Sequence, residues 1–153
     1  MPEEIRSDEF IIRRIPPSKP QIQLDFIKPI DDRRYRATSI ALALRQGETG
    51  LSCSRLRITS PKQLLAQVGV TITDGWTVAI WRVDELPTGL QVVATPSKPA
   101  ELDLGHCEIR PIDRYTKALQ SKLAGASVIL SAEEIDSMNA GEIPHRWERR
   151  PAR

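Results

Sequence analysis

The stretch WTVAIWRVDELPTGLQVVATPSKPAELDLGHCEIR, residues 76–110, decides the fold class. It contains three segments typical of strands, at 76–83, 90–96 and 106–110, with glycine- and proline-containing breaks between them. No helical pattern separates these segments, so strands and helices do not alternate strictly along the chain. This order favours an α+β fold with a mostly antiparallel sheet.

The flanking segments complete a single small domain over residues 35–140. Residues 35–44 and 51–58 are strand-like and flank the turn RQGETG, which predicts a hairpin. Helices are expected where a capping residue or an apolar stripe begins a helical pattern. They cover residues 61–68, 112–126 and 132–138. The domain is therefore expected to contain about five strands and two or three helices.

Residues 1–34 differ from this domain and predict an extended, proline-rich arm. Four prolines interrupt the stretch RIPPSKPQIQLDFIKPIDD, which excludes a helix and favours extended chain. Upstream, the segment FIIRRI is too apolar for a free linker. The arm is therefore expected to dock, on its own domain or on a partner, through Phe10, Ile12 and Phe26.

Residues 141–153 predict a basic tail. They contain four arginines against two acids, and a tryptophan lies among the arginines. Arginine binds phosphate and tryptophan stacks on bases, which fits nucleic acid, but the same residue types anchor protein interfaces. A solvated chain end is the third possibility. The residues that would contact a partner are Arg146, Trp147, Arg149 and Arg150.

The composition restricts the remaining classes. A net charge of +2 argues against a protein built wholly around a polyanion. No apolar segment reaches the roughly 20 residues of a membrane helix, and acids stand where a signal peptide needs a basic start. The sequence therefore predicts a cytoplasmic protein without a cofactor. A metal site is not expected, because the two cysteines and two histidines lack the short spacing of zinc ligands.

The segment LDLGHCEIRP brings a histidine, a cysteine and a glutamate together. Side chains alternate along a strand, so Cys107 is expected to face the core while His106 and Glu108 line the other face. His106 is then a candidate general acid or base, oriented by Glu108, with Arg55 binding an anionic substrate. The alternative is a histidine that makes only a structural hydrogen bond.

Two serines are the second candidate for chemistry. Ser52 and Ser54 share one face of the segment GLSCSRLRI, and Cys53 and Arg55 share the other. A nucleophilic serine is usually presented on a Gly-x-Ser-x-Gly turn, which this segment lacks. Serines on a strand more often form cross-strand hydrogen bonds. The chain also contains no phosphate-binding loop and no dinucleotide-binding fingerprint.

Three segments together resemble a pattern in small uncharacterised bacterial proteins. These proteins have a Leu-Ser-Val-x-Arg-like strand, a later Val-Val-x-x-Pro strand and a late strand of the Gly-His-x-x-Ile type. The counterparts here are residues 51–55, 92–96 and 105–109. Cys53 and Cys107 depart from the pattern but keep small apolar residues there. The resemblance implies no known activity; it implies that Arg55 and His106 form one site across adjacent strands.

Three functions follow as hypotheses. The favoured one is a non-enzymatic accessory subunit that docks through its arms on a larger protein partner in a bacterial multi-protein system. The second is a small hydrolase or nucleotide-processing enzyme that uses His106 as its acid or base. The third is nucleic-acid binding through the arginine- and tryptophan-containing tail.

Overall fold

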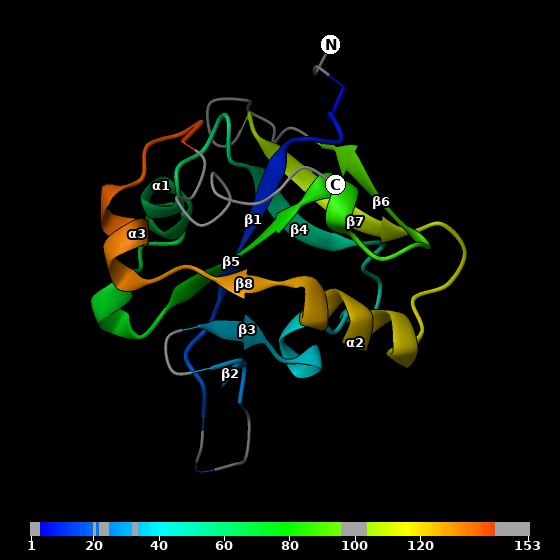
Figure 1. The fold of residues 1–153 in the computed structure, drawn as a ribbon, viewed down its shortest axis with the longest axis horizontal. Coiled ribbons are helices and arrows are strands. Elements are labelled where there is room, and N and C mark those ends of the chain that lie inside the picture. The colour runs from blue at the N-terminus through cyan, green and yellow to red at the C-terminus, as the bar shows by residue number, and fades with distance from the viewer. Residues whose placement is uncertain (1–3, 20, 22–24, 32–33, 96–103, 143–153) are drawn as a thin grey trace.

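A computed structural model describes residues 4–19, 21, 25–31, 34–95 and 104–142. Six antiparallel strands form one sheet in the order β6-β7-β4-β1-β5-β8, two more form a small second sheet, and three α-helices pack around them (Figure 1). The predicted α+β class with a mostly antiparallel sheet is confirmed. None of the helices in these ranges is both long and apolar enough to cross a membrane.

The elements have the following bounds. The large sheet contains β1 (Phe10–Ile15), β4 (Leu51–Arg55), β5 (Thr77–Arg82), β6 (Leu90–Ala94), β7 (His106–Pro111) and β8 (Val128–Ile129). The small sheet contains β2 (Ile27–Pro29) and β3 (Tyr35–Ala37). The α-helices are α1 (Pro61–Ala66), α2 (Lys117–Ala126) and α3 (Ala132–Ser137), and the 3-10 helices are η2 (Ser39–Leu42), η3 (Ile72–Asp74) and η4 (Val83–Glu85).

β1 lies in the interior of the large sheet, between β4 and β5. It is the apolar segment FIIRRI, and it forms six antiparallel residue pairs with β5. Phe10 and Ile12 are buried in the core of the same chain. The compact fold therefore begins before residue 35, and part of the expected arm is a central strand rather than a partner-facing segment.

The expected hairpin between residues 35–44 and 51–58 is not formed. Tyr35–Ala37 pairs with β2 in the small sheet, and Ser39–Leu42 is a 3-10 helix. β4 pairs instead with β1 and β7. The apolar alternation of residues 38–44 reflects a short helical turn, whose buried Leu42 packs into the core.

Capping residues set the helix starts. α1 follows Ser60, whose hydroxyl accepts a hydrogen bond from the main-chain N–H of Gln63, and proline occupies the first turn as predicted. The predicted capping box of Ser131 and Glu134 starts α3. α2 begins later than expected, because Thr116 accepts the hydrogen bond that caps it.

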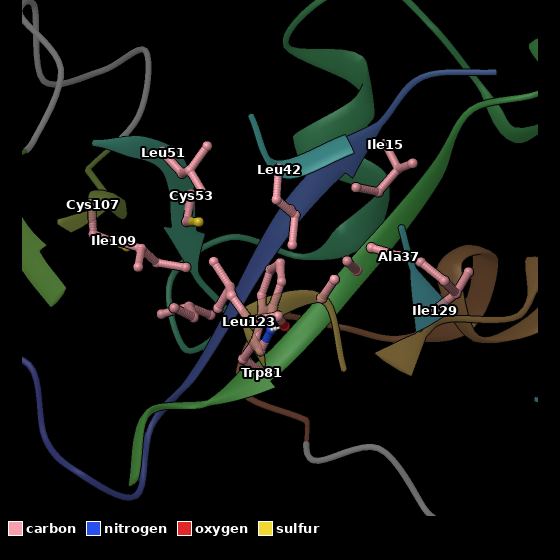
Figure 2. Packing of buried hydrophobic residues seen from close by; sticks show 13 residues of the cluster. Ile15, Ala37, Leu42, Leu51, Cys53, Trp81, Cys107, Ile109, Leu123 and Ile129 are labelled. Carbon is pink, nitrogen blue, oxygen red and sulfur yellow. Dashed lines mark hydrogen bonds between the residues drawn. The ribbon is translucent and has the colours of Figure 1, made fainter. Parts of the chain in front are cut away.

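Both faces of the large sheet carry a core. One face packs against α2 and η2 and contains Ile11, Trp81 and Leu123 (Figure 2). The indole N–H of Trp81 donates to the main-chain oxygen of Leu123 at 3.0 Å, which joins β5 to α2. The other face packs against α1 and α3 and contains Ile12 and Ile80. A residue on any strand therefore faces one of two distinct environments.

β7 alternates between these two faces as predicted. Cys107 and Ile109 are buried, whereas His106, Glu108 and Arg110 are partly exposed. In the register of β4 and β7, Cys53 lies opposite Cys107, so Cys53 shares the α2 face. The alternation places His106 on the opposite face from the cysteines.

Candidate functional site

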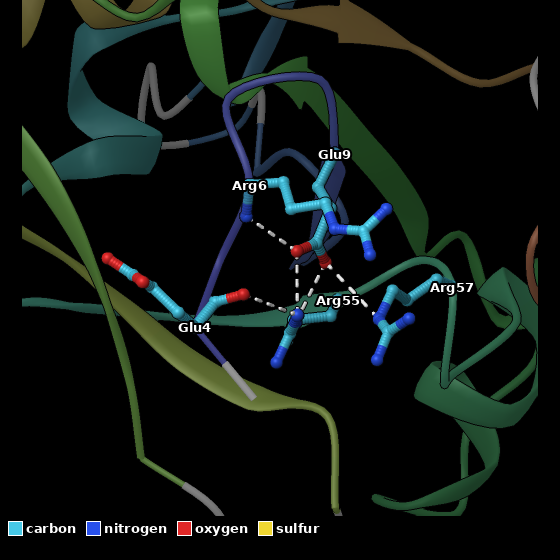
Figure 3. A network of polar contacts seen from close by, with 5 residues as sticks. All are labelled: Glu4, Arg6, Glu9, Arg55 and Arg57. Carbon is cyan, nitrogen blue, oxygen red and sulfur yellow. Dashed lines mark hydrogen bonds and ion pairs between the residues drawn. The ribbon is translucent and has the colours of Figure 1, made fainter. Parts of the chain in front are cut away.

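Arg55 forms a buried ion pair on the opposite face of the sheet from His106. Its Nε and Nη2 atoms donate to the two carboxylate oxygens of Glu9, at 2.8 and 2.6 Å, and both residues are buried (Figure 3). Ser54 lies opposite His106 in the register of β4 and β7, so the next residue, Arg55, faces the other way. The prediction that Arg55 and His106 form one site is therefore wrong.

Glu108 binds its neighbours rather than His106. Nε of Arg110 donates to Oε1 of Glu108 at 2.9 Å, and the hydroxyl of Thr49 donates to the same oxygen at 3.3 Å. Nδ1 of His106 instead lies 2.8 Å from both the main-chain oxygen and the hydroxyl oxygen of Thr95. Thr95 therefore takes the orienting position expected of Glu108.

A cleft opens where β1 and β4 separate. The two strands pair only at Ile11 with Arg55 and at Ile12 with Ser54, whereas β1 and β5 pair along all six residues of β1. The cleft has a volume of about 680 Å³ and is lined by residues of both strands, of α1 and of η2. Because it passes between the strands, it brings together side chains that alternation places on opposite faces.

Cationic and hydroxyl-bearing side chains line this cleft. Its polar residues include Arg13, Arg14, Arg45, Ser52, Ser54 and His106. No aspartate or glutamate occurs among its lining residues in the part of the chain that the structure describes. An excess of cations in a concave site raises the local concentration of anions. The cleft therefore favours a negatively charged ligand.

Arg13 is the central cation of the cleft. Its Nη1 atom donates to the main-chain oxygen of Ser52 at 2.7 Å. Its Nε atom is buried and has no hydrogen-bond partner within the described ranges, and no carboxylate there forms an ion pair with it. A half-buried cation without a counter-charge is costly. A bound anion would supply that charge.

Arg14 and Arg45 extend the positive charge to both sides. Nη1 of Arg14 donates to the main-chain oxygen of Leu64 at 2.9 Å and to Oε1 of Gln67 at 3.2 Å, which holds the side chain against α1. Arg45 follows η2 and is exposed at the rim. One arginine is thus fixed by the fold, while the other is free to follow a ligand.

The hydrogen bond to Thr95 determines which nitrogen of His106 is available. A carbonyl oxygen only accepts, so Nδ1 must carry the proton that it donates to Thr95. In the neutral ring, Nε2 is then unprotonated and makes no hydrogen bond to any described residue. Because His106 lines the cleft, this nitrogen can accept a hydrogen bond from a ligand or take a proton from it.

Cys53 also lines the cleft, but it is not an activated nucleophile. Burial raises the pKa of its thiol to about 12, against the smaller opposing effect of the Arg13 charge. The thiol therefore stays protonated near neutral pH, whereas nucleophilic attack requires the thiolate. The described residues contain no group of three or more His, Cys, Asp or Glu side chains placed to hold a metal ion.

The predicted partner-binding residues fall into two sets. Phe10 and Ile12 are in the core, and Phe26 is partly buried against it and lines the cleft, so the first two are not available to a partner. The remaining predicted contacts lie outside the described residues; they are Arg146, Trp147, Arg149 and Arg150.

The three arginines of the cleft were missed as site residues. One signal of Arg13 and Arg14 is present in the sequence: the interval from Arg13 to Arg36 holds seven basic residues against three acids, whereas Arg45 lies outside it. That excess marks the segment as basic but does not reveal which strand lies beside it. Ser52, Ser54 and His106 were recognised as candidates, and the structure adds the cations that surround them.

Fold and site together define a small α+β domain with a basic cleft through its main sheet. No family model matches the chain, and no curated protein or solved structure matches it either. The function is therefore argued from the cleft itself.

Proposed function

We propose that this protein binds a small anionic molecule in the cleft between β1 and β4. The observation that carries the proposal is the position of Arg13, a half-buried arginine that has no carboxylate partner among the described residues and lines a cleft with two further arginines. Guanidinium groups match the geometry of phosphate and carboxylate oxygens, so several arginines around one cavity suit such a ligand.

The size and lining of the cleft support a small molecule rather than a polymer. Its volume of about 680 Å³ lies within the range of roughly 300–1,000 Å³ typical of ligand sites. Apolar walls with a few convergent polar groups are also typical of such sites. His106 and the two serines supply these groups, as in the second of the three hypotheses, with Arg13 in the position expected for Arg55.

Docking of a larger protein is a separate proposal. It now rests on the partly buried Phe26 and on the C-terminal residues, because β1 uses Phe10 and Ile12 to complete the sheet. Nucleic-acid binding rests on the C-terminal residues. Both are tested by removing residues 143–153 and measuring partner or nucleic-acid binding.

Calorimetric titration of the full chain with sodium phosphate tests the anion site. We expect saturable binding with one site per chain, weakened by added salt because the charges at the rim are screened. Replacing the exposed Arg45 with alanine should lower the affinity for phosphate about threefold, because one solvent-exposed charge contact contributes about that much to binding. Arg45 makes no side-chain hydrogen bond with the described residues, so the fold should be unaffected.

Arg114 provides the matched control. It is exposed and lies outside the cleft lining, so Arg114→Ala removes the same charge from another surface. If both variants weaken phosphate binding equally, the effect is one of net charge and the cleft is not the site. The absence of any saturable binding would also overturn the proposal.

A further inference from the structure

We infer that the ligand is a phosphomonoester with an apolar or aromatic body, and this inference rests on the proposed anion site. Two observations carry it: three arginines line the cleft, and the other lining side chains are largely apolar. The first concerns the head of the ligand and the second its body. They are independent, because one depends on charge and the other on exposed apolar surface.

The arginines of the cleft indicate the head group of the ligand. Arg13 approaches from β1 and is fixed at Ser52, Arg14 is held against α1, and Arg45 stands at the rim. A carboxylate offers two oxygens to one guanidinium fork, whereas a phosphomonoester offers three and carries up to two charges near neutral pH. Three arginines around one cavity are better matched by the larger anion. The unprotonated Nε2 atom of His106 can accept a hydrogen bond only from the P–OH group of the monoprotonated phosphomonoester.

The apolar lining of the cleft indicates the chemical nature of the rest of the ligand. A bare phosphate ion would fill only a small part of about 680 Å³. The rest of the lining is largely apolar and includes Phe26, Ile40, Leu44, Leu64, Val68 and Trp76. Apart from Leu64, which is already buried, these side chains would still face water if a hydrophilic ion bound alone. An attached apolar or aromatic group would cover them, and the gain scales with the apolar area removed from water.

Two of these residues are exposed, and they come from different segments that line the cleft. Ile40 in η2 is 49% exposed and Val68, just after α1, is 48% exposed. Single exposed apolar side chains are common on protein surfaces and need no explanation. These two, however, line the same cavity as the arginines, whereas Ile112, which is 66% exposed, lies elsewhere. The pair therefore marks where the body of the ligand would lie.

Buried and exposed lining residues give the ligand an orientation. Ser54 and Cys53 are almost completely buried at the inner end, beside Arg13, whereas Ile40 and Val68 are half exposed. The phosphate would bind inside, where Arg13 lacks a counter-charge. The apolar body would extend outward between η2 and α1.

Calorimetric titration with inorganic phosphate and with phenyl phosphate tests the inference. Both share the anionic head, and only phenyl phosphate has an aromatic body. We expect the full chain to bind phenyl phosphate at least tenfold more tightly. Ile40→Ser and Val68→Ser should each remove about threefold or more of that advantage and leave the affinity for inorganic phosphate unchanged. Ile112→Ser is the matched control and should change neither affinity.

The possible results distinguish failure of the phosphomonoester inference from failure of the proposed anion site. Equal affinities for the two phosphates would overturn the inference while the anion site stands. Binding of neither would overturn both. A preference for phenyl phosphate that survives both rim substitutions would also contradict the inference, because the aromatic group would then lie elsewhere. Two rim variants are used so that poor folding of one leaves the test intact; far-UV circular dichroism checks each.

Discussion

Arg13 donates a hydrogen bond from Nη1 to the main-chain oxygen of Ser52, at 2.7 Å, across the gap between β1 and β4. At this point the two strands no longer pair, since their last residue pair joins Ile12 to Ser54. The Arg13 side chain of β1 is thus hydrogen-bonded to the main chain of β4. The same side chain places a positive charge beside the cleft. Arg13 therefore contributes both to the fold and to the proposed anion site.

Replacing Arg13 with methionine should separate these two roles. We expect the free energy of unfolding to fall by at most about 1–2 kcal/mol, because the loss of a hydrogen bond from a charged donor is partly offset by removal of a half-buried charge that lacks a counter-charge. At a phosphate concentration of 100 times its Kd, the unsubstituted protein should gain about 2.7 kcal/mol, and Arg13→Met should gain almost nothing. Urea unfolding with and without phosphate measures both effects. Arg114→Met is the control, and an equal phosphate gain in Arg13→Met would contradict the account.

The ion pair of Glu9 and Arg55 should contribute to stability rather than to binding. Glu9 also accepts a hydrogen bond from the main-chain N–H of Arg6 at 2.8 Å, so its carboxylate ties the N-terminal residues to the end of β4 (Figure 3). Glu9→Gln leaves a buried arginine without its counter-charge, which typically costs about 3–5 kcal/mol. Denaturant unfolding should show this loss with phosphate affinity unchanged.

The exposed pair of Asp31 and Arg34 is the comparison for this effect. Its atoms lie 2.6 Å apart, as in the buried pair, but both side chains are exposed. Asp31→Asn should therefore change the free energy of unfolding by about 1 kcal/mol or less. Similar losses for Glu9→Gln and Asp31→Asn would show that burial does not increase the contribution of the Glu9–Arg55 pair to the free energy of unfolding.

The neutral ring of His106 should carry its proton on Nδ1. A hydrogen bond to the main-chain oxygen of Thr95 requires this tautomer, which leaves Nε2 as the acceptor of a residue that lines the cleft. Long-range ¹H–¹⁵N correlation spectra at alkaline pH distinguish the two ring nitrogens directly. A protonated Nε2 in the neutral ring would contradict the assignment and would remove His106 as a proton acceptor.

Alkaline pH should destabilise the fold through one buried acid, Cys53, and one partly buried acid, Tyr115. Burial raises the pKa of the Cys53 thiol from 9.0 to about 12 and that of the Tyr115 hydroxyl from 10.0 to about 12. Between about pH 9 and pH 12 the unfolded chain loses these protons and the folded chain keeps them, so stability falls as pH rises. For Cys53 the slope is at most about 1.4 kcal/mol per pH unit.

Variants that lack these groups should show a flatter pH dependence. Unfolding free energies of Cys53→Val and Tyr115→Phe, measured from pH 8 to pH 11, should decline less steeply than that of the unsubstituted protein. Tyr35→Phe is the control, because Tyr35 is exposed. Identical slopes in all four proteins would show that neither acid is held protonated by the fold.

Local features of the fold were predictable from the sequence. The alternation of β7 and the caps at Ser60 and Ser131 depend on residues close together in the chain, and the structure confirms them. The α+β class also followed from local patterns, because the three strands β5, β6 and β7 occur in succession without an α-helix between them.

Long-range pairing was not predictable in the same way. The apolar segment at β1 pairs with strands about 40 to 70 residues away in its own chain. No local sequence pattern predicts whether it pairs with these strands or with a partner. The cleft exists because β1 and β4 pair at two positions only, so its arginines could not be recognised from spacing. The resemblance implied that Arg55 and His106 form one site, and no local pattern indicated the ion pair with Glu9, because that pair joins distant parts of the chain.

Mapping phosphate binding on the ¹H–¹⁵N correlation spectrum of the labelled full chain tests the anion site most directly. The titration uses sodium phosphate, with sodium chloride at matched ionic strength as the reference. We expect saturable shifts at the amides of Arg13, Arg14, Ser54 and His106, and none along α3, which lies outside the cleft lining. Shifts spread over all basic residues, or an unchanged spectrum at these four amides, would contradict an anion site between β1 and β4.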